Sequence, residues 1–162
     1  MWKPGTIFAQ NRYKAVVHLT HRDPIATQDK MVILVVEDNP LLAWMMQSEL
    51  EEAGHKVAGP VSESGKARSI AASTELDCAL VDIDLADGRT GGELAVELSK
   101  FHDCSVILAS GQSHLADTWR DDVIGLLDKP FDLSVMVSAV DAVREYRIGG
   151  EPVWPAPMRL YI

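Results

Sequence analysis

Five short apolar runs, each followed by a segment with helical spacing, constrain the fold of this chain more than any other feature. The first run, Val-Ile-Leu-Val-Val at residues 32–36, is continuous and rich in β-branched side chains, which is typical of a strand covered on both faces. Strands that alternate with helices form an open, mostly parallel sheet with helices on both sides, so the sequence predicts the α/β class. We expect strands at residues 32–36, 56–59, 78–81, 105–109 and 123–127.

The segments between these runs carry helix signals. Asn39 can cap a helix, and Pro40 suits the first position because the missing N–H would be unsatisfied there in any case. Apolar residues then recur at helical spacing up to Gly54, which ends the helix. The same reasoning predicts further helices at residues 62–72, 94–101, 113–120 and 132–147.

The length of 162 residues suits one domain with tails. A share of 47% apolar residues excludes wholesale disorder, and no apolar run approaches the roughly 18 residues of a membrane span. We expect an N-terminal extension at residues 1–30 outside the core, one domain at residues 31–148 and a short tail without periodicity at residues 149–162.

The formal charge of −9 is unevenly divided along the chain. Residues 1–30 hold five basic and two acidic side chains, a net charge of +3, which leaves −12 for the rest. An acidic body argues against nucleic acid as a partner. Cys78 and Cys104 lie in apolar runs, as free thiols do in a reducing compartment, and residues 1–30 contain no export signal. We therefore expect a cytoplasmic protein that binds neither nucleic acid nor membrane.

Polar residues follow four of the predicted strands at the point where each strand ends. In a parallel sheet these ends meet at one edge, where α/β proteins bind their ligands. Three carboxylates, a hydroxyl and an ammonium are therefore predicted to converge. They belong to Glu37 and Asp38 after the first run, Asp82 after the third, Ser110 after the fourth and Lys129 after the fifth, and Asp84 follows two residues after Asp82.

Such a cluster favours phosphoryl chemistry with a divalent ion. Carboxylates held together repel one another unless a cation joins them, and hard oxygen ligands on an open site suit Mg²⁺. Lys129 can pair with a carboxylate and then with a phosphoryl oxygen, to which Ser110 can also donate. A carboxylate placed beside Mg²⁺ and an ammonium can attack phosphorus as a nucleophile, which gives an aspartyl phosphate.

Four motifs stand in order at these strand ends: Glu37-Asp38-Asn39-Pro40, Leu80-Val81-Asp82-Ile83-Asp84-Leu85, Ile107-Leu108-Ala109-Ser110-Gly111 and Lys129-Pro130-Phe131. Together they resemble the bacterial response-regulator receiver domain, and the match covers residues 31–147. The resemblance implies a flavodoxin-like fold with a five-stranded parallel sheet of order 2-1-3-4-5. It also implies a stand-alone phosphoacceptor of a two-component or phosphorelay system.

The resemblance implies a role for each acidic residue. Asp82 resembles the phosphoacceptor, and Glu37 and Asp38 resemble the acidic pair that holds Mg²⁺ with it. Asp84 resembles the residue that lends its backbone carbonyl to the metal ion. We expect the side chains of Asp84 and Gln112 to tune dephosphorylation instead.

The remaining site residues and the partners follow in the same way. Ser110 matches the switch hydroxyl that moves towards the phosphoryl group, Lys129 matches the lysine that contacts it, and Pro130 matches a proline preceded by a cis peptide bond. The phosphodonor would be a sensor histidine kinase or a phosphotransfer protein. Because the segment after the last helix is too short for an output domain, we expect signalling through protein contacts. The chain would be no enzyme beyond its own phosphotransfer and dephosphorylation.

Three features depart from the family pattern. Ala86 stands four residues after the phosphoacceptor, where receivers usually carry proline. The loop that follows is longer, through Gly91 and Gly92. Leu126 stands three residues before the lysine, in place of the aromatic residue that couples the switch hydroxyl to the output face. The sequence thus predicts an intact phosphorylation site with an altered readout.

Two other functions stay open. The segment Val81-Asp82-Ile83-Asp84-Leu85 also resembles the nucleophile motif of haloacid-dehalogenase-like phosphatases, in which the second aspartate is the general acid. In that family the motif opens the domain, whereas here a strand with Glu37 and Asp38 precedes it. The other alternative is an interaction module that keeps the fold and is not phosphorylated, which Leu126 would allow.

Overall fold

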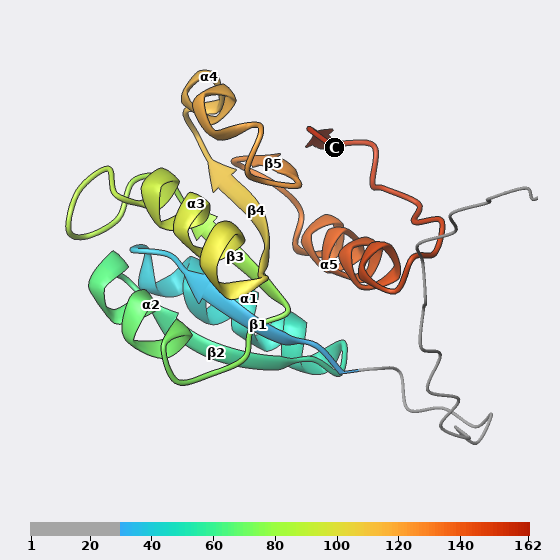
Figure 1. The fold of residues 1–162 in the computed structure, drawn as a ribbon, viewed down its shortest axis with the longest axis horizontal. Coiled ribbons are helices and arrows are strands. Elements are labelled where there is room, and N and C mark those ends of the chain that lie inside the picture. Colours follow the sequence, from blue (N-terminus) through green and yellow to red (C-terminus); the bar gives the residue numbers. More distant parts are fainter. Residues whose placement is uncertain (1–29) are drawn as a thin grey trace, which may run out of the picture.

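A central sheet of six strands organises residues 30–162, the part of the chain that the computed structural model describes. The strand order is β2-β1-β3-β4-β5-β6 (Figure 1). Strands β1 to β5 are parallel, which confirms the predicted order 2-1-3-4-5, and β6 runs antiparallel to β5. The strands are β1 Val32–Val36, β2 Lys56–Val61, β3 Cys78–Asp82, β4 Ser105–Ser110, β5 Gly125–Asp128 and β6 Met158–Leu160. The predicted N-terminal extension lies outside the described residues except for Lys30.

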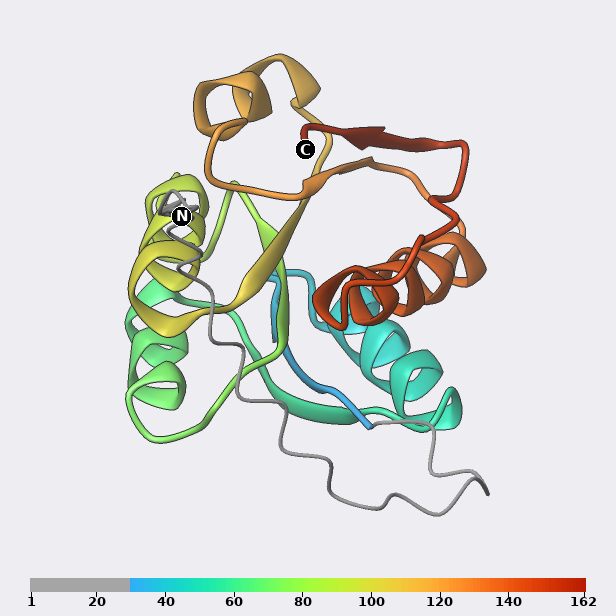
Figure 2. The same ribbon diagram turned by 45° about the vertical axis from the view of Figure 1, so that its right-hand side comes forward.

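Helices cover both faces of the sheet (Figure 2). Helices α1 and α5 pack on one face, and α2, α3 and α4 pack on the other. The architecture is the expected α/β, flavodoxin-like fold. The helices are α1 Pro40–Glu52, α2 Ser64–Ala71, α3 Gly91–His102, α4 Ser113–Ala116 and α5 Leu133–Arg147, and a single 3-10 turn, η1 Asp117–Trp119, follows α4.

Strand β1 shows how the apolar runs produce this layering. Ile33 and Val35 belong to the core layer beneath α1 and α5, whereas Leu34 and Val36 belong to the layer beneath α2 and α3. None of the four side chains is more than 1% exposed. A strand with one solvated face would alternate apolar and polar residues, so the continuous run indicates burial on both faces. The structure confirms that interpretation.

The first helix begins as its sequence predicts, whereas the fourth does not extend as far. Asn39 Oδ1 accepts the N–H groups of Leu41 and Leu42 at 3.1 and 3.2 Å, and Pro40 is the first residue of α1. The sequence predicts one helix at residues 113–120, but the structure has a single α-helical turn followed by η1. Gln112 at the start of α4 makes no side-chain capping hydrogen bond, so this helix lacks the local signal that fixes α1.

The C-terminal segment adds a strand that the sequence does not predict. Residues 149–162 show no periodicity, yet Met158–Leu160 form β6 on the edge of β5. Three residues are too few for an alternating pattern to indicate a strand. These residues form a strand because they reach the free edge of β5 and pair with it. Among residues 30–162, no helix is both long and apolar enough to cross a membrane.

Candidate functional site

Lys129 joins the carboxyl ends of β1 and β3. Its ammonium nitrogen lies 2.5 Å from Glu37 Oε2 and 2.5 Å from Asp82 Oδ2. The Lys129 side chain is 20% exposed, and those of Glu37 and Asp82 are 1% and 10% exposed. The peptide bond between Lys129 and Pro130 is cis, as the resemblance implies. Charge-assisted hydrogen bonds with this little exposure to solvent are stronger than ion pairs on the surface.

The pKa values of these groups reflect burial and pairing together. Burial raises the pKa of Glu37, and the charge of Asp82 adds to this rise, while the Lys129 ammonium and the N–H of Asn39 oppose it. Burial disfavours the charge of Lys129, but the hydrogen bonds to Asp82 and Glu37 outweigh this cost and raise the Lys129 pKa. Lys129 therefore stays charged at neutral pH.

Glu37, Asp38 and Asp82 form a group that fits a metal ion. One carboxylate oxygen of each lies within 4.8 Å of the others. Glu37 and Asp82 are buried and Asp38 is exposed, so the group opens to water on one side. Hard oxygen donors on a partly open site suit Mg²⁺, which usually keeps several water ligands. A divalent ion would also offset the repulsion among the three carboxylates.

The side chain of Asp84 belongs to a different network. Its N–H donates to Asp82 Oδ1 at 3.2 Å, but its carboxylate accepts from Arg89 Nε at 3.0 Å and from Gln112 Nε2 at 2.8 Å. Arg89 Nη2 also donates to Gln112 Oε1 at 3.4 Å. This closed ring ties the loop after β3 to the loop after β4, next to Asp82. Sequence reasoning identifies Asp84 and Gln112 but misses Arg89, because one arginine in a polar loop carries no signal of its own.

Ser110 is fully buried at the end of β4. Asp82 pairs with Ala109 across the sheet, so Ser110 stands one residue further along the neighbouring strand. Ser110 Oγ accepts the N–H of Gln112 at 3.0 Å, and the Ser110 carbonyl accepts the N–H of Lys129 at 2.9 Å. A hydroxyl carries one donor proton besides its two acceptor lone pairs, so Ser110 can still donate to a ligand while Oγ accepts from Gln112.

Two glycines allow α3 to pack closely against the end of β3 and against η1. A Cβ atom on Gly91 would lie 1.8 Å from the carbonyl oxygen of Asp82, and one on Gly92 would lie 2.2 Å from the Trp119 ring. The sequence places both glycines in a longer loop, whereas the structure begins α3 at Gly91. Gly91 therefore serves close packing against the end of β3, and Gly92 serves close packing against η1, so neither simply lengthens the loop.

The other two departures from the family pattern also have structural consequences. The N–H of Ala86 donates to the carbonyl oxygen of Ser62 at 2.9 Å, a hydrogen bond that proline could not make. Leu126 is fully buried in β5 and packs in the core layer beneath α2 and α3. Position 126 therefore contributes an aliphatic core contact where the family pattern has an aromatic ring.

Carboxylates, an ammonium and a hydroxyl at the carboxyl ends of a doubly wound parallel sheet define a class of α/β domains suited to accept a phosphoryl group. The model of the response regulator receiver domain family matches residues 33–141. The chain belongs to this family, and it is a phosphoacceptor signalling domain of the two-component type.

Individual relatives agree with this assignment. The chain is 34% identical over 110 residues to the phyllosphere-induced regulator PhyR of Methylorubrum extorquens. This aligned segment covers 67% of the chain and 41% of PhyR. The chain thus spans less than half the length of this relative. The structure resembles the signal receiver domain of a modulated diguanylate cyclase from Desulfovibrio desulfuricans, with 27% identity, a TM-score of 0.65 and coverage of 75% of this chain and 99% of that one. It also resembles the response regulator TrrA from Thermotoga maritima, solved in complex with Mg²⁺ and BeF, with 25% identity, a TM-score of 0.63 and coverage of 70% and 98%.

Proposed function

We propose that Asp82 accepts the phosphoryl group. The observation that carries this assignment is the Lys129 ammonium, which is held between Asp82 and Glu37 at the carboxyl ends of three strands. A carboxylate becomes a useful nucleophile towards phosphorus when positive charge beside it can stabilise the phosphoryl oxygens. Glu37 and Asp82 both pair with this ammonium and both belong to the candidate metal group. Of the two, Asp82 is the more open to a phosphodonor, since its side chain is 10% exposed and that of Glu37 is 1% exposed.

The transfer would proceed as a displacement at phosphorus. A carboxylate oxygen of Asp82 forms a bond to phosphorus while the bond between phosphorus and the donor's nitrogen or oxygen breaks, and the donor leaves with that electron pair. Lys129 carries three N–H donors, so it can contact a phosphoryl oxygen in addition to its two carboxylates. The hydroxyl group of Ser110 donates a hydrogen bond to a second phosphoryl oxygen. Both hydrogen bonds stabilise the phosphorylated state, and they draw the ends of β4 and β5 towards the phosphoryl group.

The metal ion that suits this site is Mg²⁺. We propose that Glu37, Asp38 and Asp82 hold it through carboxylate oxygens and that Asp84 contributes its backbone carbonyl. When bound, the ion supplies positive charge that neutralises the transferred phosphoryl oxygens. The three clustered carboxylates support this part of the proposal.

The partners follow from the chemistry of the transfer. We propose a sensor histidine kinase or a phosphotransfer protein as phosphodonor, and a protein contact as the output. The receiver domain would span residues 31–148, and its only reactions would be its own phosphorylation and dephosphorylation. A phosphoryl group adds negative charge at the strand ends, which can bias a surface between two states.

The phosphatase alternative needs Asp84 as a general acid that can reach the leaving group. The Asp84 carboxylate instead accepts two hydrogen bonds, from Arg89 and Gln112. Both oxygens of this carboxylate are thus engaged with neighbouring side chains and are not held ready for a leaving group. The geometry therefore favours a phosphoacceptor over a phosphatase.

The test is to incubate the full chain with Mg²⁺ and acetyl phosphate and to measure its intact mass. We expect one adduct with the mass of a phosphoryl group that is stable in acid and labile in base, and that is absent from Asp82→Ala. The matched control is Asp121→Ala, which removes an exposed carboxylate before β5. Continuous release of phosphate without a lasting adduct would instead indicate a phosphatase. No adduct and no Mg²⁺ binding would indicate a module that is not phosphorylated.

A further inference from the structure

The chain covers the edge of its own sheet with its C-terminal segment. Strand β6 pairs with β5 in the register Gly125↔Leu160, Leu126↔Arg159 and Leu127↔Met158. The N–H of Tyr161 continues this ladder and donates to the carbonyl of Ile124 at 3.0 Å. Figures 1 and 2 both show the C-terminal segment returning past α5 to lie along β5. Without it, β5 would present unpaired backbone groups to solvent.

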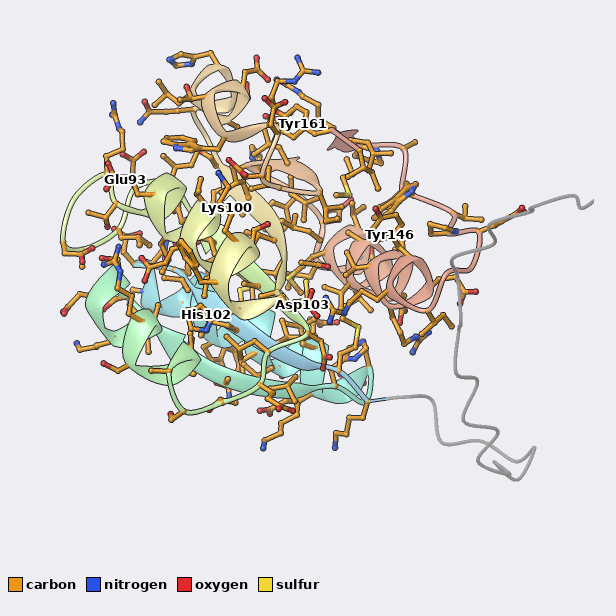
Figure 3. All side chains as sticks on the ribbon, in the orientation of Figure 1. Glu93, Lys100, His102, Asp103, Tyr146 and Tyr161 are labelled. Atoms are coloured by element: carbon orange, nitrogen blue, oxygen red, sulfur yellow. The ribbon has the colours of Figure 1, made fainter. Side chains whose placement is uncertain are left out.

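The side chains of this segment enter both faces of the sheet. Met158 is 7% exposed and packs in the core layer beneath α1 and α5. Tyr161 packs against the opposite layer, on the side of α4 (Figure 3), and its hydroxyl donates to Asp117 Oδ1 at 2.9 Å. The guanidinium of Arg120 lies 5.7 Å from the centre of the Tyr161 ring. The β5 edge thus has two side-chain sites. The first is an apolar recess that holds Met158, and the second is an aromatic site in which Asp117 and Arg120 contact Tyr161.

Acidic groups flank the same edge. The guanidinium of Arg159 lies 3.4 Å from Asp128 Oδ2 and 3.8 Å from Asp117 Oδ1. These two carboxylates stand on either side of the docked segment, at the end of β5 and in η1. The two carboxylates complement the charge of a basic residue that stands, like Arg159, between an apolar residue such as Met158 and an aromatic residue such as Tyr161.

Gly125 indicates that the edge is shaped for a strand in contact with it. A Cβ atom at position 125 would lie 2.4 Å from the carbonyl oxygen of Arg159 and 2.7 Å from Met158 Cε. The backbone of Gly125 does not have a positive φ, so conformational freedom does not explain this glycine. Close approach of a neighbouring strand does explain it.

The segment can leave without opening the rest of the sheet. Only three of its residues form β6, and β5 stays paired with β4 on its other side. The ion pairs of Arg159 are exposed, with its side chain at 41%, so they contribute little to the hold. Between α5 and β6 the described chain forms no helix or strand. Trp154 anchors this connection against α5, with its ring centre 6.1 Å from that of Tyr146, so the segment after Trp154 can leave while this anchor stays in place.

We propose that the β5 edge is a docking site for an extended peptide segment of a partner protein, and that residues 158–161 are its internal occupant. The preferred ligand has the pattern of this occupant: an apolar residue, a basic residue, any residue and an aromatic residue with a hydroxyl, as in Met158-Arg159-Leu160-Tyr161. Backbone pairing with β5 supplies affinity. Selectivity comes from the apolar recess, from the carboxylates of Asp117 and Asp128, and from the aromatic site. A partner segment would bind by displacing β6.

The test uses a fluorescent peptide with the sequence of residues 151–162 and full-length chains. The natural chain is compared with the double variant Met158→Asp/Tyr161→Ala, whose own segment is weakened on both faces. We expect saturable binding to the variant, at least about tenfold tighter than to the natural chain, whose edge is occupied. A peptide carrying Arg159→Glu should bind the variant several-fold more weakly, and a scrambled peptide should not bind. Amide signals of residues 124–127 should shift on binding.

The outcomes separate cleanly. Circular dichroism checks that the variant is folded, and the milder variant Arg159→Glu/Tyr161→Phe replaces it if it is not. Absence of binding to the folded variant would overturn the proposal. Equal binding to both chains, or equal binding of the Arg159→Glu peptide, would place the peptide elsewhere and also overturn it. The measurements are made without Mg²⁺ or phosphodonor, so their result does not depend on the assignment of Asp82.

Discussion

The strand ends that carry the proposed phosphoacceptor and the β5 edge that carries β6 both contain ion pairs, but these pairs differ in their exposure to solvent. We call the first region, with Glu37, Asp82 and Lys129, the acidic rim. There the Lys129 side chain is 20% exposed, and its ammonium nitrogen lies 2.5 Å from each of two buried carboxylates. At the β5 edge the Arg159 side chain is 41% exposed, and its guanidinium lies 3.4 Å from its nearest carboxylate, that of Asp128. The rim is held by desolvated charge, whereas the edge is held by backbone pairing and apolar contact.

The difference matches the two tasks. At the rim, buried charges that are already in place lose little to solvent reorganisation when a phosphoryl group arrives, which is what electrostatic catalysis requires. At the edge, exposed pairs are weak and a three-residue strand is easily exchanged. One region is suited to fixed chemistry and the other to exchangeable contacts.

The largest effect should follow from removing the ammonium of the rim. In Lys129→Met, Glu37 and Asp82 would face one another without the cation, and the phosphoryl oxygens would lose a donor. We expect the rate of phosphorylation by acetyl phosphate to fall by about 100-fold, the usual cost of one well-placed donor. The rate is measured by intact mass over time.

The matched control for this variant is Lys100→Met. Lys100 pairs with Asp122 at 3.1 Å, away from the rim, and its side chain is 54% exposed. Its rate should stay within about twofold of the natural chain, since exposed pairs contribute little. If Lys129→Met and Lys100→Met reacted equally fast, the rim would not be the site of transfer.

The rim is the region that could be predicted from sequence, although its members are far apart in the chain. Lys129 and Glu37 are 92 positions apart, further than the 44 positions between Tyr161 and Asp117. What makes the rim predictable is a general rule: parallel strands bring their carboxyl ends to one edge. Glu37 and Asp82 directly follow apolar runs, and Lys129 follows one after a single intervening residue, so recognising the run places the residue.

No comparable rule covers the parts that sequence reasoning misses. Strand β6 returns antiparallel, and nothing in residues 149–162 states which edge it meets. Arg89 completes its ring only because two loops approach one another. Gly91 looks like a loop residue until the distance from Asp82 to α3 is known. These features depend on tertiary distances, which a local pattern does not encode.

The next largest effect tests the packing beneath the rim. A methyl group in Gly91→Ala would meet the carbonyl oxygen of Asp82 at 1.8 Å, so α3 must shift. We expect the free energy of unfolding to fall by roughly 2 kcal/mol, as is usual for overpacking. The control Gly65→Ala, in α2, has open space around the added methyl and should be neutral or slightly stabilising. Urea unfolding measures both, and equal midpoints would contradict the packing argument.

A smaller effect is expected at the β5 edge. A methyl group in Gly125→Ala would lie 2.4 Å from the carbonyl oxygen of Arg159, but β6 can move away more easily than α3 can. We expect a loss of about 1 kcal/mol in the free energy of unfolding. Hydrogen exchange should show lost protection at the amide of Tyr161, while the amides of β3 keep theirs. Retained protection at Tyr161 would show that close approach does not account for this glycine.

The smallest effect concerns the end of the sheet opposite the rim, where His55 precedes β2. His55 is 3% exposed, and neither ring nitrogen has a hydrogen-bond partner among the described residues. Burial lowers the pKa of His55 below 6.5, and the positive charge of Arg144 lowers it further. The negative charge of Asp141 opposes this change, but its carboxylate lies 3.6 Å from the ring, which is too far for a good hydrogen bond. Below pH 6.5 the unfolded chain therefore binds a proton that the folded chain does not. The free energy of unfolding should fall as the pH drops through 6.5, by less than about 1 kcal/mol in total, because the fall ends below the lowered pKa of the folded chain.

Substitution of this histidine separates the two ends of the sheet. Urea unfolding between about pH 7.5 and about pH 5.5, without divalent ions, should show the slope in the natural chain and in the control His114→Gln, which replaces an exposed histidine in α4. In His55→Gln the slope should disappear. Glu37 in the rim cannot produce the same loss, because its raised pKa makes the folded chain bind protons more readily than the unfolded chain as the pH falls towards 4.5. A slope that persisted in His55→Gln would therefore contradict the assignment to His55.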